Sequence, residues 1–409
     1  MENPKIRFKG FTKDWEQRKF GEVVEKYEDP VETPTEGYMR LGIRSHAKGT
    51  FHNYVEKGKE LETAKMFRVA ADKFIVNITF GWEHAVAITD KNDAGKLVSH
   101  RFPQYSFNEG MIPKFFRYLI LDESFKHHLE LSSPGGAGRN RVLKLNEMLE
   151  YKMSFPSEEE QKKIASYFEK LDHLITLHQR KCDQTKNLKK YMLQKMFPQN
   201  GAKVPEIRFD GYTYDWEQRK LGDLVNRITR KNQDLVSELP LTISAQYGLI
   251  DQNEFFDKRV ASKDVSGYYL IENGEFAYNK STSTDAPWGA IKRLDRYENG
   301  VLSTLYIVFG IKENNLVDSD FLVSYYSTNL WHKGIHEIAA EGARNHGLLN
   351  IAPADFFETK LMIPQDIEEQ KKIGKYFEEL DHLITLHQRK CDELKKMKKY
   401  MLQNMFICL

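Results

Sequence analysis

Thirteen consecutive residues occur twice in this chain, letter for letter. The run LDHLITLHQRKCD spans Leu171 to Asp183 and returns at Leu380 to Asp392, 209 positions later. Flanking letters repeat as well, with QKKI before each copy and YMLQ after it. A chain with one such segment near its middle and another at its end is expected to be built as two similar halves.

Each copy is typical of one long amphipathic helix. In the first copy, apolar and small residues recur at alternating steps of four and three, namely Ile164, Phe168, Leu171, Ile175, His178 and Cys182. A wider stripe adds Leu174, Leu177, Leu188, Tyr191, Met192 and Met196. The helix is expected over 157–197, opened by a capping box of Ser157 and Glu160. Asp366 and Glu369 restore that spacing in the second copy.

An apolar seam on a long helix needs a partner, and the nearest one is the other copy. Antiparallel pairing of the two helices would form a stiff coiled-coil strut with pseudo-twofold symmetry. The alternative is two helices that pack separately, each on its own domain. The repetition of surface residues such as Gln179 and Arg180 favours the strut, because core packing alone does not require them.

Length and composition restrict the class of protein. The 409 residues are enough for two or three domains, and the apolar and charged fractions are those of a soluble globular chain. With only three cysteines, a reducing compartment is indicated. The start has no secretory pattern and no apolar run approaches a membrane span, so a cytoplasmic protein without a membrane partner is expected. The net charge of +2 does not by itself indicate a nucleic-acid binder.

A second repeat opens each half. The segment from Arg7 to Gly21 returns from Arg208 to Gly222, and both copies contain the letters DWEQRK. We expect Trp15 and Trp216 to pack against the globular region that follows. Four parts result, namely a globular domain with its entry motif at 1–155, a helix at 156–200, a second globular domain with its entry motif at 201–363 and a second helix at 364–409.

The regions between the entry motifs and the helices, residues 22–155 and 223–363, share only a scattered pattern. Short apolar strands are predicted at 73–77 and 275–279, and helical stretches at 114–130 and 318–338. Each region also has a Gly-rich basic loop, at 135–141 and 342–347. The fold class is therefore α+β, with two globular domains separated by two long antiparallel helices.

These motifs resemble the DNA-specificity subunits of type I restriction–modification systems. The resemblance rests on the two WEQRK entries, on the helix starts with Glu160-Gln161 after Pro156 and Glu369-Gln370 after Pro364, and on the duplicated helices, and it covers essentially the whole chain. It implies that each variable region is a target recognition domain for one half of a split double-stranded DNA site. It also implies that the helices set the gap and dock two adenine-methylating subunits, which restriction and translocation subunits join.

The residues indicate no chemistry of the chain's own. The sequence contains no P-loop and no NPPY methylation motif, and the Gly-rich loop at 135–138 does not precede a Rossmann helix. The pairs His127/His128 and His332/His336 lack Cys or carboxylate partners at ligand spacing. We therefore expect no metal, no cofactor and no catalysis by this chain alone.

DNA contact needs basic groups for phosphates and amide, guanidinium or hydroxyl groups for base edges. In the first region the candidates are Arg40, Arg44, His46, Lys48, Arg139, Asn140 and Arg141. In the second region they are Ser244, Gln246, Tyr247, Lys280, Arg344, Asn345 and His346. The Arg-Asn pair occurs in the Gly-rich loop of both regions, which favours a shared role. Solvated loops would carry the same residues, and Trp82 and Trp288 suit either a place beside these loops or the core.

Two other functions fit parts of the pattern. A coiled-coil scaffold that binds only protein would explain the helices, and a specificity subunit of another restriction class would share the same spacer. A nuclease would need a cluster of carboxylates and lysine at metal-site spacing, which the sequence does not show. A non-catalytic DNA-recognition subunit accounts for the most features.

Overall fold

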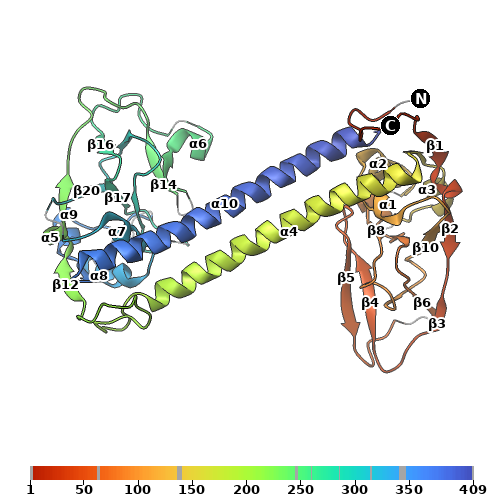
Figure 1. The fold of residues 1–409 in the computed structure, drawn as a ribbon, viewed down its shortest axis with the longest axis horizontal. Coiled ribbons are helices and arrows are strands. Elements are labelled where there is room, and N and C mark those ends of the chain that lie inside the picture. Colours follow the sequence, from red (N-terminus) through yellow and green to blue (C-terminus); the bar gives the residue numbers. More distant parts are fainter. Residues whose placement is uncertain are drawn as a thin grey trace. The chain divides into compact units, whose positions relative to one another are not determined.

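Two structural units each combine a globular region with parts of both long helices. The computed structural model describes residues 3–61, 65–135, 141–244, 247–258, 260–284, 286–313, 316–339 and 347–407. The first unit comprises residues 1–179 and 389–409, and the second comprises residues 180–388. The long helices α4 (Glu158–Lys195) and α10 (Ile367–Met405) therefore contribute to both units (Figure 1). Both predicted long helices are confirmed.

Contacts between α4 and α10 show that the two helices run antiparallel in one register. Each unit supplies one thiol-to-amide contact and one ion pair across the seam. These are Cys391–Gln179 and Lys398–Asp172 in the first unit, and Cys182–Gln388 and Lys189–Asp381 in the second. In every pair the two residue numbers add up to 570, so both units use the same register. The alternative of two separately packed helices is therefore wrong.

Only part of the predicted apolar stripe lies in this seam or in a core. Ile164, Phe168, Leu171 and Cys182 are buried as expected. Leu174, Leu188 and Tyr191, which widen the stripe, are exposed. The matching residues of α10 are exposed too, namely Leu383, Met397 and Tyr400. A seam between two helices covers a narrow stripe on each, and the wider stripe therefore stays outside it.

The first unit contains two sheets and a short two-stranded ladder. Strand β1 (Glu16–Lys19) pairs with β11 (Lys152–Phe155), beside the start of α4. One sheet shares a core with the long helices and is called the proximal sheet; the other is called the distal sheet. The proximal sheet has the order β2 (Val24–Tyr27), β10 (Gln104–Phe107), β7 (Phe74–Val76), β8 (Val86–Ile88). The distal sheet has the order β3 (Pro30–Glu32), β6 (Lys65–Arg68), β9 (Leu97–Val98), β4 (Tyr38–Ile43), β5 (Thr50–Val55).

The second unit repeats this plan. Strand β12 (Glu217–Lys220) pairs with β21 (Lys360–Ile363). The proximal sheet has the order β13 (Val225–Ile228), β20 (Ile307–Ile311), β17 (Phe276–Asn279), β18 (Ala290–Arg293). Two distal ladders pair β14 (Leu241–Ser244) with β15 (Gly248–Asp251) and β16 (Tyr269–Glu272) with β19 (Asn299–Leu302).

Short helices accompany the sheets of both units, and all but η2 and α6 occur at corresponding places in the chain. In the first unit they are η1 (Phe20–Glu22), η2 (Gly81–Glu83), α1 (Pro113–Leu119), α2 (Glu123–Leu131) and α3 (Leu145–Leu149). In the second they are α5 (Leu221–Leu224), α6 (Gln252–Phe256), α7 (Ser319–Tyr326), α8 (Leu330–Ile338) and α9 (Pro353–Glu358). The helical stretches expected at 114–130 and 318–338 are therefore each two helices.

Each core joins an entry tryptophan to both long helices. Trp15 lies in a cluster with Phe115, Phe168 of α4 and Phe406, which directly follows α10. The second core brings Trp216 together with Phe321, Phe377 of α10 and Phe197, which follows the end of α4. Both tryptophans are only 2% exposed, which confirms that they pack against the globular regions.

The repeated polar motifs connect the entry segment to the start of each long helix. Arg7 donates to both oxygens of the buried Glu160 at 2.7 and 2.8 Å, and Arg208 does the same to Glu369. The neighbouring Gln161 accepts from Ile112 N and donates to Pro156 O. The capping-box interpretation of Glu160 and Glu369 is therefore wrong, because these carboxylates bind arginines more than 150 positions away.

Candidate DNA-reading surface

The turn between β4 and β5 carries three of the predicted DNA-contacting residues. Arg44, His46 and Lys48 are all exposed on it, while Arg40 is half-buried within β4. The Arg44 N–H donates to Gly49 O at 2.9 Å and closes the turn. The segment 40–48 is therefore part strand and part turn, with Arg40 in β4 and the other three residues in the turn.

This turn is held against η2 by backbone and side-chain bonds. The N–H groups of His46 and Ala47, both at positive φ, donate to Glu83 O and His84 O at 2.8 Å. The Ser45 hydroxyl donates to the Glu83 carboxylate at 2.5 Å. Left-handed backbone at two consecutive non-glycine residues costs conformational energy, and these bonds offset it. The turn is therefore held in one conformation rather than left to adapt.

Arg141 meets the same η2 turn from another part of the chain. Its guanidinium carbon lies 5.4 Å from the ring centre of Trp82, a cation–π geometry, and its Nη1 lies 3.9 Å from Glu130. Leu143 N donates to Ile78 O at 2.8 Å and fixes the chain beside η2. Trp82 is half-buried, and Arg141 covers its ring. The predicted Arg139 and Asn140 lie outside the described residues.

His84 fastens η2 to the helical layer. It is 4% exposed, and its Nε2 bonds Ile120 O at 2.8 Å. Burial lowers the pKa of His84 to about 4, so the ring is neutral at neutral pH and donates its Nε2–H to the carbonyl. Sequence reasoning missed both His84 and Glu83. The only signal was their position directly after Gly81-Trp82, which does not reveal their partners.

The candidates in the second unit are arranged differently. Ser244 is buried and its hydroxyl accepts from Tyr247 N at 3.3 Å, closing the β14–β15 turn, while the Tyr247 side chain is exposed. Lys280 is half-buried, and burial lowers the pKa of its ammonium. Gln246, Arg344, Asn345 and His346 lie outside the described residues.

The flanks of the two Gly-rich loops are nevertheless placed alike. Leu349 N donates to Lys280 O, as Leu143 N donates to Ile78 O in the first unit. Ile78 and Lys280 each stand four residues after the phenylalanine of their strand that pairs with the neighbouring strand, Phe74 in β7 and Phe276 in β17. Trp288 is half-buried and contacts His336 edge-on, with ring centres 5.0 Å apart. The residues that follow the two Gly-rich loops are therefore bonded at equivalent positions, after β7 and after β17.

No group of His, Cys, Asp or Glu side chains suited to hold a metal ion occurs among the described residues. Likewise, none of the described helices is long and apolar enough to cross a membrane.

Comparison with known proteins identifies the family. The family described as "Type I restriction modification DNA specificity domain" matches residues 12–187 and again residues 214–396. The chain belongs to this family. Each match to the specificity domain starts within or beside an entry motif and runs through a globular region into a long helix. The duplication is thus a duplication of the family's own domain.

One solved structure of a type I S subunit shares the fold of this chain. The S subunit of a type I restriction–modification system from M. genitalium has 13% sequence identity and a TM-score of 0.59, with full coverage of both chains. An HsdS subunit from Thermoanaerobacter tengcongensis is 16% identical over 96% of both chains, with a TM-score of 0.46. At these identities, the first likeness supports the fold and not the contacts of single residues.

Proposed function

We propose that this chain is the non-catalytic specificity subunit of a type I restriction–modification complex. Each globular region reads one half of a bipartite sequence in double-stranded DNA. The observation that carries this proposal is one frame built twice with different exposed hairpins, β4–β5 and β14–β15. Direct reading in the major groove uses side chains presented from such elements. We assign recognition to residues 1–155 and 201–363, and the spacer to residues 156–200 and 364–409.

The long helices are proposed to set the unread gap between the two half-sites. Their antiparallel register is the same in both units. The α4 segment enters the two cores with Phe168 and Phe197, and the α10 segment enters them with Phe406 and Phe377. An element anchored at both ends can transmit a fixed spacing. Insertion of one helical turn should therefore lengthen the gap, and an unchanged gap would contradict this role.

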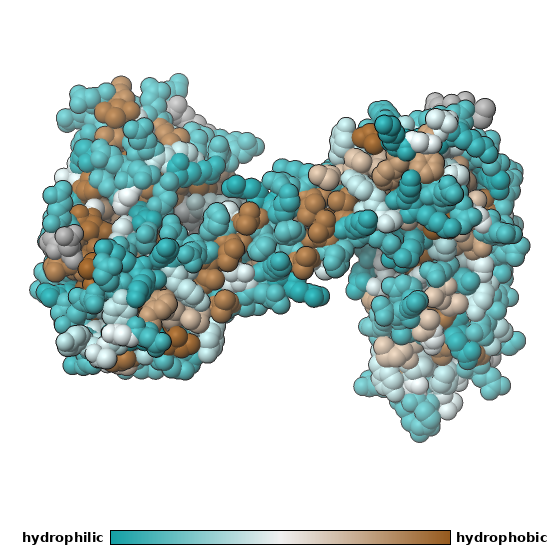
Figure 2. All heavy atoms as spheres, viewed as in Figure 1, coloured by the Kyte–Doolittle hydropathy of each residue, from teal (hydrophilic) through white to brown (hydrophobic). Residues whose placement is uncertain are grey.

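The exposed apolar residues of the long helices support docking of two methyltransferase subunits. Leu174, Leu188 and Tyr191 each have an exposed counterpart 209 positions later, namely Leu383, Met397 and Tyr400. Figure 2 shows hydrophobic side chains gathered along these helices. Two equivalent surfaces suit two copies of one partner. Restriction and translocation subunits would join this methyltransferase core.

The deciding experiment is genome-wide mapping of methylated adenine. A host carrying this gene with its methyltransferase gene is compared with the same host lacking only this gene. Loss of a two-part motif with a fixed gap is the expected result. If no motif changes, DNA recognition is contradicted and the scaffold function becomes the better explanation.

Exchange of one region tests the two-reader arrangement. Residues 223–363 are replaced by those of a relative with a different sequence in that region. One half-site should change while the other half-site and the gap stay as they were. A change in both half-sites would contradict independent reading.

A further inference from the structure

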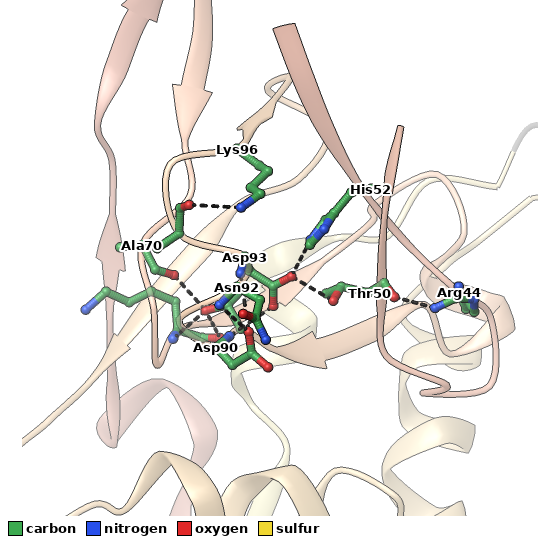
Figure 3. Close-up of polar contacts among 11 residues, drawn as sticks. Arg44, Thr50, His52, Ala70, Asp90, Asn92, Asp93 and Lys96 are labelled. Atoms are coloured by element: carbon green, nitrogen blue, oxygen red, sulfur yellow. Dashed lines mark hydrogen bonds and ion pairs between the residues drawn. The ribbon is translucent and has the colours of Figure 1, made fainter. Parts of the chain in front are cut away.

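A buried carboxylate lies beside the start of β5, next to the β4–β5 turn. Asp93 is 3% exposed, and its Oδ1 accepts from Thr50 Oγ1 at 2.8 Å and bonds His52 Nε2 at 2.8 Å. Its Oδ2 accepts from Asp90 N at 2.9 Å. Thr50 and His52 stand two residues apart on β5 and therefore point to the same face, toward Asp93 (Figure 3).

The same strand holds the side chain of Arg44. The carbonyl of Thr50 accepts a hydrogen bond from Arg44 Nη1, and the Arg44 guanidinium carbon lies 5.3 Å from the ring centre of Phe51. Phe51 is itself set against Gly42, its cross-strand partner, where an added Cβ would come within 2.3 Å of the ring. The guanidinium is thus placed by a carbonyl and a ring on the strand that Asp93 fastens.

Arg44 remains exposed although it is held in this way. A guanidinium offers a planar fork of donors that suits two acceptors at once, and in the major groove guanine presents O6 and N7 as such a pair. Readout of this kind needs the fork to be placed accurately, which a long flexible side chain achieves only when it is supported. The contacts of Thr50 and Phe51 supply that support.

We propose that Arg44 reads a guanine in the half-site of the first unit, and that Asp93 is a positioning residue that holds Thr50 and β5 so that Arg44 is correctly placed. This inference rests on the proposed function of the chain as a DNA-reading subunit. It is specific to the first unit, since the turn at 244–248 of the second unit carries Ser244 and Tyr247 instead.

The test uses the full chain in complex with its methyltransferase subunits. The exchange of residues 223–363 first identifies which half-site belongs to the first unit, as the half that persists. Methylated sites are then mapped for Arg44→Ala, Arg44→Lys, Asp93→Asn, Thr50→Val and Thr50→Ser. Lys57→Ala serves as the matched control, because Lys57 is an exposed cation beyond the other end of β5 and pairs with Glu36 at the surface.

Arg44→Ala and Arg44→Lys should both relax one guanine of that half-site by about 5- to 150-fold, the range for one bidentate contact. Lysine fails as well, because an ammonium does not form the planar fork. Asp93→Asn and Thr50→Val should relax the same position by less, whereas Thr50→Ser and Lys57→Ala should leave it unchanged. The second half-site and the gap should not change in any variant.

Three results would separate the possible errors. If the wild type directs no motif, the proposed function itself fails. If the wild-type motif survives Arg44→Ala with every position intact, Arg44 does not read a base. If Arg44→Ala relaxes a guanine but neither Asp93→Asn nor Thr50→Val does, Asp93 has no positioning role. If Asp93→Asn abolishes the motif by unfolding the unit, the Thr50 variants test the positioning role instead. Thr50→Val removes the hydroxyl that binds Asp93, and Thr50→Ser keeps it.

Discussion

The distal sheets of the two units have the same strand order but different continuity. In the first unit β3, β6, β9, β4 and β5 form one five-stranded sheet. In the second unit β16 pairs with β19 and β14 pairs with β15, and among the described residues these two ladders pair with each other only through a parallel bridge between Pro240 and Val301. The bridge corresponds to the parallel pairing of β4 and β9 through Arg40 and Leu97 in the first unit. The proximal sheets, in contrast, keep four strands in one order in both units.

This contrast shows which contacts restrict sequence change. The frame common to both units, which consists of the entry segment, the proximal sheet and the start of a long helix, contains the buried carboxylates Glu160 and Glu369. Loss of the arginine bound to either carboxylate would leave a buried charge unpaired. The hairpin turns carry exposed side chains such as Lys48 and Tyr247, and substitutions at exposed positions typically change stability by about 0.5 kcal/mol or less. A protein built in this way can change what its hairpins present without losing its frame.

The largest expected effect comes from removing the arginine that pairs with the buried carboxylate in each unit. Arg7→Ala and Arg208→Ala should each destabilise their own unit by about 3–5 kcal/mol, because each leaves a buried carboxylate without its guanidinium. The loss should be larger for Arg7→Ala. Glu369 still receives the Trp216 indole N–H at 3.3 Å, whereas the Trp15 indole nitrogen has no hydrogen-bond partner among the described residues.

Hydrogen exchange, followed separately for amides of each unit, measures this loss without assuming that the chain unfolds in one step. Arg18→Ala is a suitable control, because Arg18 and Glu16 form an ion pair at the surface. Equal losses for Arg7→Ala and Arg208→Ala would show that the tryptophan contact adds nothing.

A second effect concerns pH and the first unit. Since the pKa of His84 is about 4 in the folded chain and about 6.5 in an unfolded one, the unfolded state binds more protons between these values. Stability contributed by the neutral ring is thus fully present above pH 6.5 and is lost as the pH falls to 4. The loss should amount to about 3 kcal/mol.

The measurement is denaturant unfolding of the wild type and of His84→Asn from pH 7 to pH 4. Asparagine accepts the left-handed backbone at this position, φ 59°, so the variant removes the imidazole and not the turn. The difference in stability between the two proteins should shrink as the pH falls. A constant difference would mean that His84 is protonated, or free to leave its site, in the folded chain.

Much of the frame could be predicted from the sequence because it repeats. The thirteen-residue repeat gave two long helices, and their shared surface residues indicated antiparallel pairing, which the contacts at Cys182 and Cys391 confirm. The short strands at 73–77 and 275–279 appear as β7 and β17. Periodic apolar patterns are local signals, and local signals are what a single sequence carries.

The errors share one physical cause, which is contact over long sequence distance. The spacing of Ser157 and Glu160 matches a capping box, but Arg7 competes for that carboxylate from 153 positions away. The spacing that puts Leu174 and Leu188 on the helical stripe does not show that they are exposed. Likewise, no spacing in the sequence joins Asp93 to Thr50 or Glu83 to Ser45, so the supports of the candidate site were missed while its exposed Arg44 was found.

The smallest effect compares the two equivalent ion pairs between the long helices. In the first unit Tyr118 donates its hydroxyl to Asp172 at 3.0 Å, and the Lys398 ammonium lies 5.4 Å from the Tyr118 ring centre. Ser324 takes the matching position in the second unit and bonds Asp320 O instead. Lys398→Met should therefore cost about 1 kcal/mol, and Lys189→Met about half as much, since partly exposed pairs contribute little.

Methionine keeps the long apolar stem that packs along the helices and removes only the charge, so the loss reports the ion pair rather than the packing. Double-mutant cycles with Asp172→Asn and Asp381→Asn give the coupling energy of each pair. Adding Tyr118→Phe to the first cycle should lower its coupling energy to that of the second unit. If the two coupling energies already agree in the presence of Tyr118, the tyrosine contributes to the helix seam by packing alone, and the two ends of the helix pair are energetically equivalent despite their different neighbours.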